Sequence, residues 1–247
     1  MSKKIVIIPT FNERENIEEI IRAVFNLYQT FDVLIVDDNS PDGTAKIVKS
    51  LQEHEFALNL HLLERKIKNG LGTAYIEGFK WCIQKGYEYI FEMDADFSHN
   101  PNDLPKLFEA LVAGADVAIG SRYKTGVNVV NWPMSRVMMS YFASSYVRFI
   151  TGMNIHDTTA GFVGYHRNVL SHIELDAIKF RGYAFQIEMK FTAWKHGFQI
   201  EEVPIIFTDR TKGESKISKG IIKEAVIGVI TMKFKSFFRK YSQAKKS

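Results

Sequence analysis

The sequence predicts a single α/β domain, in which helices cover both faces of a mainly parallel sheet, followed by a C-terminal extension. Short apolar runs, typical of buried strands, alternate along the first half with segments whose apolar residues recur at helical spacing. No internal repeat, low-complexity segment or linker rich in Gly, Pro or Ser divides the 247 residues. These two observations favour one domain over two.

The elements of the first half follow one another in strand–helix order. The β-branched run at residues 5–8 predicts the first strand, and Asn12 is a capping residue type before a helix with apolar positions from Ile17 to Phe25. Later apolar runs predict further strands at 33–36, 60–63, 89–93 and 117–119. Further helices are expected after the turn at 40–43, at 74–83, and from Pro101 to the residue before Gly114.

Composition excludes several classes of protein. Hydrophobic residues make up 46% and charged residues 24%, which excludes global disorder. The single cysteine, Cys82, allows no internal disulfide and no zinc ribbon, and it favours a reducing compartment. The apolar run after Met1 is too short for a signal-peptide core, and no uncharged stretch approaches the roughly 18 residues of a membrane span. We therefore expect a cytoplasmic protein.

The net charge of +4 is unevenly distributed. From Lys219 to the end the chain has eight basic residues and one acid, a formal charge of +7, which leaves −3 for residues 1–218. Apolar side chains, three of them phenylalanines, are interspersed among these lysines. A basic, aromatic-bearing helix suits the membrane interface, although a helix packed on the domain with a basic tail is the alternative. We expect a catalytic domain at 1–218 and a basic amphipathic segment at 219–247.

Polar clusters follow four of the predicted strands. Ligands of open α/β sheets bind beyond the carboxyl ends of the strands, and packing alone does not explain four polar strand exits on one edge. The clusters are Pro9-Thr10-Phe11-Asn12-Glu13, Asp37-Asp38-Asn39-Ser40, Asp94-Ala95-Asp96 and Gly120-Ser121-Arg122.

The triplet Asp94-Ala95-Asp96 is the candidate metal site. Two carboxylates directly after an apolar strand can bind Mg²⁺ or Mn²⁺ together with substrate phosphate oxygens, whereas a solvated acidic turn is the plain alternative. The seven histidines show no ligand spacing, which argues against zinc. Asp37-Asp38 could bind the ribose or base of a nucleotide, or form an acidic turn. The chain has neither Gly-x-Gly-x-x-Gly after the first strand nor a Walker motif.

Together these motifs resemble family 2 glycosyltransferases of the GT-A (Rossmann-like) fold, and the second half is similar to dolichol-phosphate (polyprenol-phosphate) mannosyltransferases. The resemblance covers roughly residues 4–218. In the second half it rests on Gly120-Ser121-Arg122-Tyr123, Trp132-Pro133-x-Ser135-Arg136, Asp157-x-Thr159-Ala160-Gly161-Phe162, Gly182-Tyr183-x-Phe185-Gln186-Ile187-Glu188 and Asp209-Arg210-x-x-x-Gly213-Glu214-Ser215-Lys216.

The resemblance implies transfer of mannose from GDP-mannose to a polyprenyl phosphate, and it implies a role for particular residues. Asp96 would ligate a divalent metal, and Ser98 stands where the family often has a Gln ligand. A basic, Gly-containing loop at 210–216 can fold over the donor diphosphate, and Arg122 after the fifth strand could reach the same phosphates. Arg136 and Ser140 are four residues apart, so on a helix they would share one face, which the resemblance assigns to the acceptor phosphate. The residues implied are Pro9, Phe11, Glu13, Val36 and Asp38 for guanosine, Asp94 and Ala95 along the nucleotide-sugar, Arg122, Arg210 and Lys216 for the diphosphate, and Arg136 and Ser140 for the acceptor.

A phosphate acceptor would explain why no general base is evident. A phosphate monoester oxygen is already anionic at neutral pH, so the enzyme must supply orientation and charge neutralisation. Direct in-line displacement would invert the anomeric centre and give a β-linked product. Glu188 could be a base in a relative that accepts a hydroxyl, and here we expect it to organise the site.

Other functions remain open at this stage. A glucosyl or N-acetylhexosaminyl transferase using a UDP-sugar fits the same motifs. A nucleotidyltransferase would need a Gly-rich phosphate loop near the first strand, and the segment 9–13 has none. A non-catalytic nucleotide- and lipid-binding module would bind without turnover. The expected partners are GDP-mannose, polyprenyl phosphate and a membrane surface, not a nucleic acid.

Overall fold

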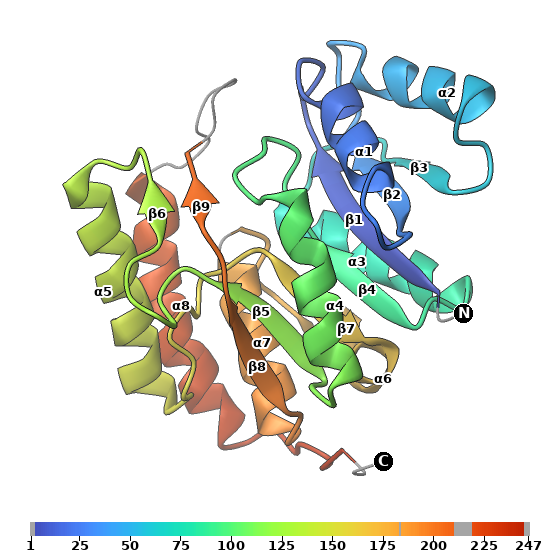
Figure 1. The fold of residues 1–247 in the computed structure, drawn as a ribbon. Helices are drawn as coiled ribbons and strands as arrows, with labels where there is room; N and C mark the ends of the chain where they lie inside the picture. Colours follow the sequence, from blue (N-terminus) through green and yellow to red (C-terminus); the bar gives the residue numbers. More distant parts are fainter. Residues whose placement is uncertain (1–2, 183, 210–218, 245–247) are drawn as a thin grey trace.

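A seven-stranded sheet organises the chain (Figure 1). The computed structural model describes residues 3–182, 184–209 and 219–244, with the backbone alone at 219–225. The strands are β1 (Lys4–Thr10), β2 (Asp32–Asp37), β3 (Leu60–Glu64), β4 (Tyr89–Glu92), β5 (Val117–Ser121), β7 (Val163–His166) and β8 (Ile200–Pro204), in the spatial order β3-β2-β1-β4-β7-β5-β8. Only β7 runs antiparallel to its neighbours, β4 and β5. The prediction of a mainly parallel sheet is therefore confirmed.

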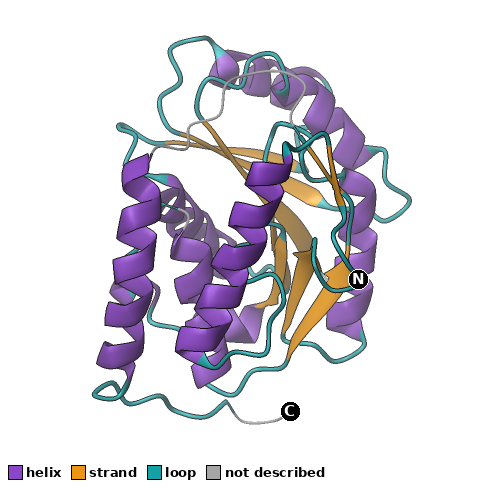
Figure 2. Ribbon diagram, turned by 90° about the vertical axis from the view of Figure 1, so that its left-hand side faces the viewer, coloured by secondary structure: helices purple, strands orange, loops and turns teal. Residues whose placement is uncertain are grey.

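Helices lie on both faces of this sheet (Figure 2). Those on one face are α1 (Ile17–Phe25), α2 (Thr44–His54) and α4 (Leu104–Val112); those on the other include α3 (Leu71–Gln84), α6 (Arg167–His172) and α7 (Ala184–Lys195). Short 3-10 helices precede α4 at Pro101–Asp103 and α7 at Leu175–Ala177. The helices predicted in the first half are all present.

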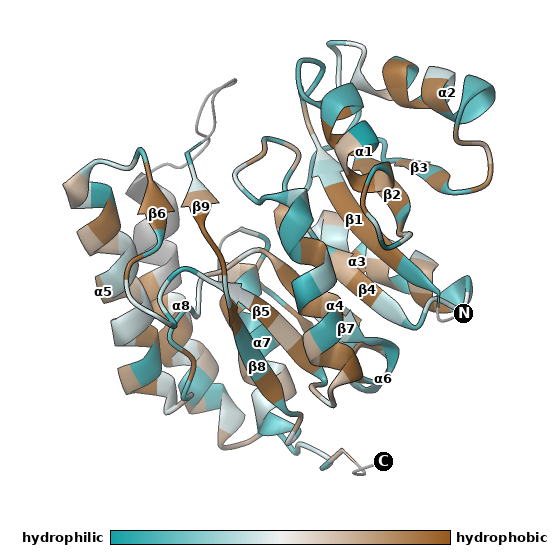
Figure 3. Cartoon of the chain, viewed as in Figure 1, coloured by the Kyte–Doolittle hydropathy of each residue, from teal (hydrophilic) through white to brown (hydrophobic). Residues whose placement is uncertain are grey.

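Alternation along β1 shows how a continuous apolar run serves two cores. Ile5 and Ile7 belong to the core that contains α3 and α7, whereas Val6 and Ile8 belong to the core that contains α1 and α4. Successive strand side chains point to opposite faces, so a strand buried on both faces needs apolar residues at every position. Figure 3 shows β1 and β2 as largely hydrophobic for this reason.

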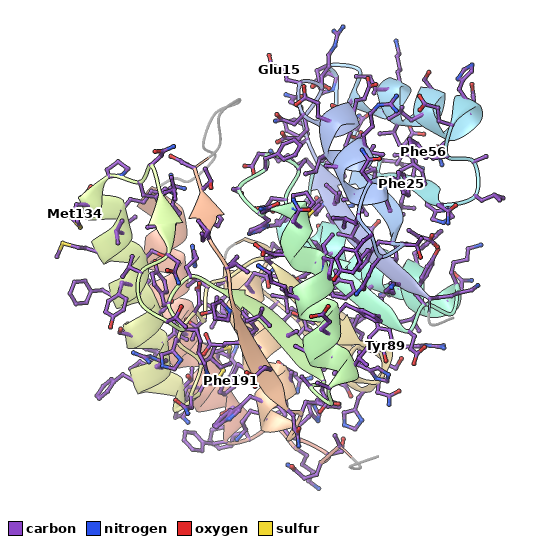
Figure 4. All side chains as sticks on the ribbon, viewed as in Figure 1. Glu15, Phe25, Phe56, Tyr89, Met134 and Phe191 are labelled. Carbon is purple, nitrogen blue, oxygen red and sulfur yellow. The ribbon has the colours of Figure 1, made fainter. Side chains whose placement is uncertain are left out.

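Aromatic side chains contribute to the packing of the helices on both faces of the sheet (Figure 4). Phe25 at the end of α1 stacks on Phe56 after α2, with ring centroids 4.3 Å apart. Tyr89 meets Phe108 of α4 edge-on at 5.1 Å, and Phe191 of α7 is buried in the opposite core. These contacts pack the helices against the sheet.

Two long helices form a separate wall beside the sheet (Figure 1). The helix α5 (Met134–Thr151) packs against α8 (Lys219–Ser236). The two-stranded parallel pair β6 (Val129–Val130) and β9 (Phe207–Thr208) lies near the start of α5. Of these elements, the sequence predicted only a helix at Arg136 and Ser140 and a basic helix within the segment 219–247.

The helix α8 packs on the rest of the domain. Val229 is 1% exposed in the core that contains α3 and α7, and Gly228 faces Phe180 so closely that a Cβ there would lie 2.5 Å from its ring. The Lys233 ammonium donates to the carbonyl of Thr151 at 2.8 Å. Part of the segment predicted at 219–247 is therefore a packed helix. The boundary predicted at residue 218 lies outside the described residues. Within the described residues, no helix is long and apolar enough to cross a membrane.

The two faces of α8 predict opposite effects of the same substitution. Val229→Asp places a carboxylate in the core and should lower the free energy of unfolding by several kcal/mol. Ile230, which is 51% exposed, is the matched control, and Ile230→Asp should change stability by no more than about 0.5 kcal/mol. Denaturant unfolding followed by circular dichroism measures both. Equal stability of the two variants would contradict the packing of α8.

Candidate functional site

The segment after β4 forms a compact acidic turn. Asp96 is 7% exposed, and its Oδ1 accepts hydrogen bonds from the Ser98 amide at 3.1 Å and from the Ser98 hydroxyl at 2.6 Å. Phe97 between them adopts a positive φ of 60°, which turns the chain sharply at this point. Asp94 is more open, with 40% of its side chain exposed. The turn thus fixes one carboxylate and leaves the other near solvent.

His99 belongs to this turn and was not among the predicted site residues. Its ring stacks on Phe162 at 4.9 Å, and its Nδ1 accepts the Asp94 amide hydrogen at 3.2 Å. Burial lowers the pKa of His99 to about 4, so the imidazole is neutral at pH 7. Because Nδ1 is an acceptor, the ring proton is assigned to Nε2. Nothing in the spacing of the histidines indicated this role, since it depends on a hydrogen bond to the backbone.

The exits of β1 and β2 form the second polar region. Asp37 accepts from the Thr10 hydroxyl at 2.8 Å and from the Ser40 hydroxyl at 2.6 Å. Asp38 is 6% exposed and pairs with Arg65 at 2.6 Å. Burial raises the pKa of the Asp38 carboxyl, and the charge of Arg65 opposes that rise. Arg65 was not predicted, because the sequence around the end of β3 does not indicate an ion pair with a residue that follows β2.

The remaining predicted nucleotide-binding residues lie at this edge of the sheet or in the chain that leaves it. The ammonium of Lys68 lies 3.9 Å from the centre of the Phe11 ring, and Glu13 accepts from the amide of Asn16 at 3.1 Å. Pro9 belongs to β1. Val36 is fully buried and packs in the core, so only its backbone can meet a ligand.

Arg122, at the exit of β5, is held by a buried ion pair. Its Nε and Nη2 lie 2.7 and 2.6 Å from the two carboxylate oxygens of Asp157, and Nη2 also donates to the Thr159 hydroxyl at 2.9 Å. Burial alone would raise the pKa of Asp157, but the charge and hydrogen bonds of Arg122 outweigh it and hold that pKa below its ordinary value. Asp157 therefore remains a carboxylate that fixes the guanidinium.

A cavity of about 430 Å³ joins the acidic turn to the wall formed by α5 and α8. The cavity places Arg122 and two residues of α5, Arg136 and Ser140, on the same surface as the acidic turn. Arg136 lies 4.1 Å from the centre of the Trp132 ring and pairs with Asp209 at 2.8 Å. The predicted residues that line the cavity are Asp94, Asp96, Ser98, Arg122, Arg136 and Ser140.

The other predicted residues that the structure describes do not line this cavity. Pro9, Phe11, Glu13, Val36 and Asp38 belong to the β1–β2 edge, and Ala95, 3% exposed, packs in the core. Arg210 and Lys216 lie outside the described residues. Glu188 lines a different cavity, where its carboxylate accepts the amide hydrogens of Lys179 and Phe180 at 2.8 and 2.9 Å. It therefore holds the backbone that leads into α7.

The donor set of the acidic turn fits a hard divalent cation that shares substrate phosphate oxygens. The described residues contain no group of three or more His, Cys, Asp or Glu side chains arranged for a metal ion. Mg²⁺ and Mn²⁺ sites in nucleotide enzymes commonly use only one or two carboxylates together with phosphate oxygens and water. Asp96, oriented by Ser98 beside the cavity, is a ligand of the required kind.

Comparison with known proteins identifies the class that this fold and site define. The glycosyl transferase family 2 model matches residues 5–174, and the chain belongs to that family. It is 46% identical over 227 residues to polyprenol monophosphomannose synthase of Mycolicibacterium smegmatis, covering 92% of this chain and 85% of that protein. It is likewise 46% identical over 225 residues to undecaprenyl-phosphate mannosyltransferase of Micrococcus luteus, covering 91% of each.

Solved structures agree on the fold. Glucosyl-3-phosphoglycerate synthase from Mycobacterium tuberculosis, in complex with Mn²⁺, UDP and glucosyl-3-phosphoglycerate, superposes with a TM-score of 0.66 at 15% identity, covering 94% of this chain and 78% of that one. Its complex with Mn²⁺, UDP-glucose and phosphoglyceric acid gives a TM-score of 0.67 at 14% identity, covering 98% and 81%. The fold is therefore GT-A-like, and the predictions of a glycosyltransferase family and of its fold class are confirmed.

Proposed function

We propose that this glycosyltransferase moves mannose from GDP-mannose to a polyprenyl phosphate, with inversion to a β-linked product. Two relatives at 46% identity over nine-tenths of the chain carry names of polyprenyl-phosphate mannosyltransferases. The observation that carries the proposal is the cavity itself. One end has the acidic turn and Arg122, while the other is walled by apolar side chains of α5 and α8 such as Phe142, Val147 and Val226.

The polar end suits a reaction between two phosphate-bearing substrates. The guanidinium groups of Arg122 and Arg136 border the same cavity and can bind phosphate oxygens. The acceptor phosphate oxygen attacks the anomeric carbon as the bond to the donor diphosphate breaks, so no protein base has to remove a proton. Asp96 would hold the divalent metal, whose chemistry is to neutralise charge on the leaving diphosphate.

The donor nucleoside is assigned to the edge formed by β1 and β2. Asp37 and Asp38 are fixed there by Thr10, Ser40 and Arg65, which orients acidic acceptors toward a base or ribose. The same groups would accept a uridine nucleotide. The alternative is therefore a glucosyl or N-acetylhexosaminyl transferase that uses UDP-sugars. An assay with a panel of donor nucleotide sugars distinguishes it from a mannosyltransferase that uses GDP-mannose.

The apolar wall extends to an exposed surface that we assign to a membrane. Met138, Phe142 and Phe149 of α5 are between 50% and 86% exposed, and Ile227, Ile230 and Phe234 of α8 are between 51% and 63% exposed. Figure 4 shows Met134 at the start of α5, directed away from the sheet. Lys233 and Lys235 accompany the apolar residues of α8. This combination suits peripheral attachment to an anionic lipid surface, where a polyprenyl acceptor resides.

The carboxylate of Asp96 is the first target for a test of function. Asp96→Asn keeps an oxygen for the hydrogen bonds from Ser98 but removes the charge, and transfer should fall on the order of a thousandfold. The assay uses radiolabelled nucleotide sugars, Mg²⁺ or Mn²⁺, and polyprenyl phosphate in detergent. Asp116→Asn is the control, because Asp116 directly precedes β5 and does not line the cavity. Near-parental turnover by folded Asp96→Asn would contradict the metal assignment, and preference for a UDP-sugar would overturn the donor.

Substitution of each of the two arginines of α5 distinguishes a role in acceptor binding from a general effect of charge. Arg136→Met should raise the KM for polyprenyl phosphate about tenfold or more and change the KM for GDP-mannose little, since one charge-assisted contact to phosphate is lost. Arg148→Met, on the same helix but outside the cavity, should leave both constants near parental values. Steady-state kinetics with each substrate varied in turn measures the effect. A change confined to the donor KM would reverse the assignment.

Vesicle binding tests the membrane surface. Ile230→Asp combined with Phe234→Asp should weaken sedimentation with anionic liposomes severalfold, since apolar insertion is lost while every lysine remains. Leu58→Asp replaces a residue that is 85% exposed and lies before β3, and it is the control. High salt should reduce binding of the parent only in part, because salt screens charge without removing apolar insertion. Undiminished binding by the paired variant would reject this surface.

A further inference from the structure

A fully buried lysine, Lys190, lies in the middle of α7 behind the wall of the cavity. Its Nζ lies 2.5 Å from the carbonyl oxygen of Ala160 and 3.3 Å from those of Thr158 and Gln186. Gln186 belongs to the preceding turn of α7, whereas Thr158 and Ala160 belong to the segment 157–161 before β7. Lys190 therefore ties α7 to that segment.

These contacts identify the charged form of the side chain. Three carbonyl acceptors match the three N–H donors of an ammonium group, and a neutral amine has only two. Burial lowers the pKa of Lys190 to about 8, and the negative charge of Asp157 opposes that effect. Burial also raises the pKa of Glu92 to about 8, so this carboxyl is largely protonated at neutral pH. Arg122 and Glu202 are the other charged groups nearby. At neutral pH the group is therefore an ammonium.

Stability alone does not explain a buried lysine at this position. Glu92, at the end of β4, is also fully buried and accepts from the Gln186 amide at 2.9 Å. Within the described residues its second oxygen has no hydrogen-bond partner, and neither has the side-chain oxygen Oε1 of Gln186 or the Thr158 hydroxyl. Replacing a buried ionic cluster of this kind by apolar residues is often neutral or stabilising. A role in orienting the neighbouring segment accounts for the arrangement better than stability does.

The segment that Lys190 holds carries the partners of Arg122. Thr159 lies between the two carbonyls that the ammonium binds, and its hydroxyl accepts from Arg122 Nη2 at 2.9 Å. Asp157, two residues earlier, accepts three further hydrogen bonds from the Arg122 amide and guanidinium. Both Thr159 and Arg122 line the cavity. A shift of the peptide groups on either side of Thr159 would move its hydroxyl and loosen the guanidinium.

We propose that Lys190 is a positioning residue: its ammonium pins the carbonyls of Thr158 and Ala160 to α7 and so aims Arg122 into the cavity through Thr159. The reaction it serves rests on the proposed function, but its action on the segment 157–161 does not. Lys190 touches no substrate in this arrangement. Its effect must pass through Thr159, and that requirement makes the proposal testable.

The test pairs Lys190→Met with Glu92→Gln, so that no uncompensated buried charge remains. Lys195→Met, on the same helix and partly exposed, is the control. Three quantities are measured on the full chain: the midpoint of thermal unfolding, amide hydrogen exchange of a peptide covering residues 156–162, and kcat/KM for mannosyl transfer. The same paired substitution is also made in a Thr159→Val background, which completes a double-mutant cycle.

The expected result is specific to a positioning role. The paired variant should keep an unfolding midpoint at least equal to that of the parent, exchange faster at 156–162, and lose at least tenfold in kcat/KM. In the Thr159→Val background the same substitution should cost less than threefold. Unchanged exchange, or equal losses in both backgrounds, would overturn the proposal. A parent without mannosyl transfer would reject the proposed function alone, since hydrogen exchange still decides the role of Lys190.

Discussion

The buried pair of Arg122 and Asp157 is the interaction on which the polar end of the cavity depends. Asp157 is 0% exposed, its amide donates to Glu202 of β8 at 2.9 Å, and Glu202 also accepts from the Ser121 hydroxyl at the end of β5. The Glu202 carboxylate thereby connects β8 and the end of β5 with the segment that leads into β7. Removing one partner of such a pair costs about 3–5 kcal/mol, because the other charge stays buried without compensation.

The mixed sheet explains why one cavity has both a polar and an apolar end. The parallel strands β1, β2, β4 and β5 bring their carboxyl ends to a single edge, where the backbone turns and polar side chains gather. The antiparallel strand β7 lies between β4 and β5, and the segments flanking it carry Thr159 and Gly161 of the cavity wall. Outside the sheet, α5 and α8 add apolar walls that no strand could supply, since strand side chains here are committed to the two cores. Figure 1 shows this wall beside the strands β6 and β9.

Sequence reasoning was most successful where the signal was local. The apolar runs predicted the strands β1 to β5, whereas β7 and β8 of the same sheet were not predicted. The four-residue spacing of Arg136 and Ser140 predicted a shared helix face, which α5 provides. It was less successful where a polar group depends on a distant partner. Arg65 with Asp38, His99 with the Asp94 amide, and Lys190 with Ala160 are set by tertiary packing over 27, five and 30 residues, and none has a periodic signature. Val36 shows a different limit of sequence reasoning. Its side chain is buried in the core, so only its backbone can contribute to binding.

The same physical reasoning explains how arginines that already form ion pairs can serve both folding and binding. Within the described part of the chain, Arg122 directs Nε and Nη2 at Asp157 and Thr159, and Arg136 directs Nη1 at Asp209. A guanidinium has five N–H donors in one plane, so these contacts do not exhaust either group. A phosphate that enters the cavity can therefore be bound by the remaining donors while the ion pair with Asp157 stays intact. The Asp157 carboxylate keeps Arg122 charged and oriented before any substrate binds. Most of the conformational entropy of the Arg122 side chain is therefore lost during folding and not during binding.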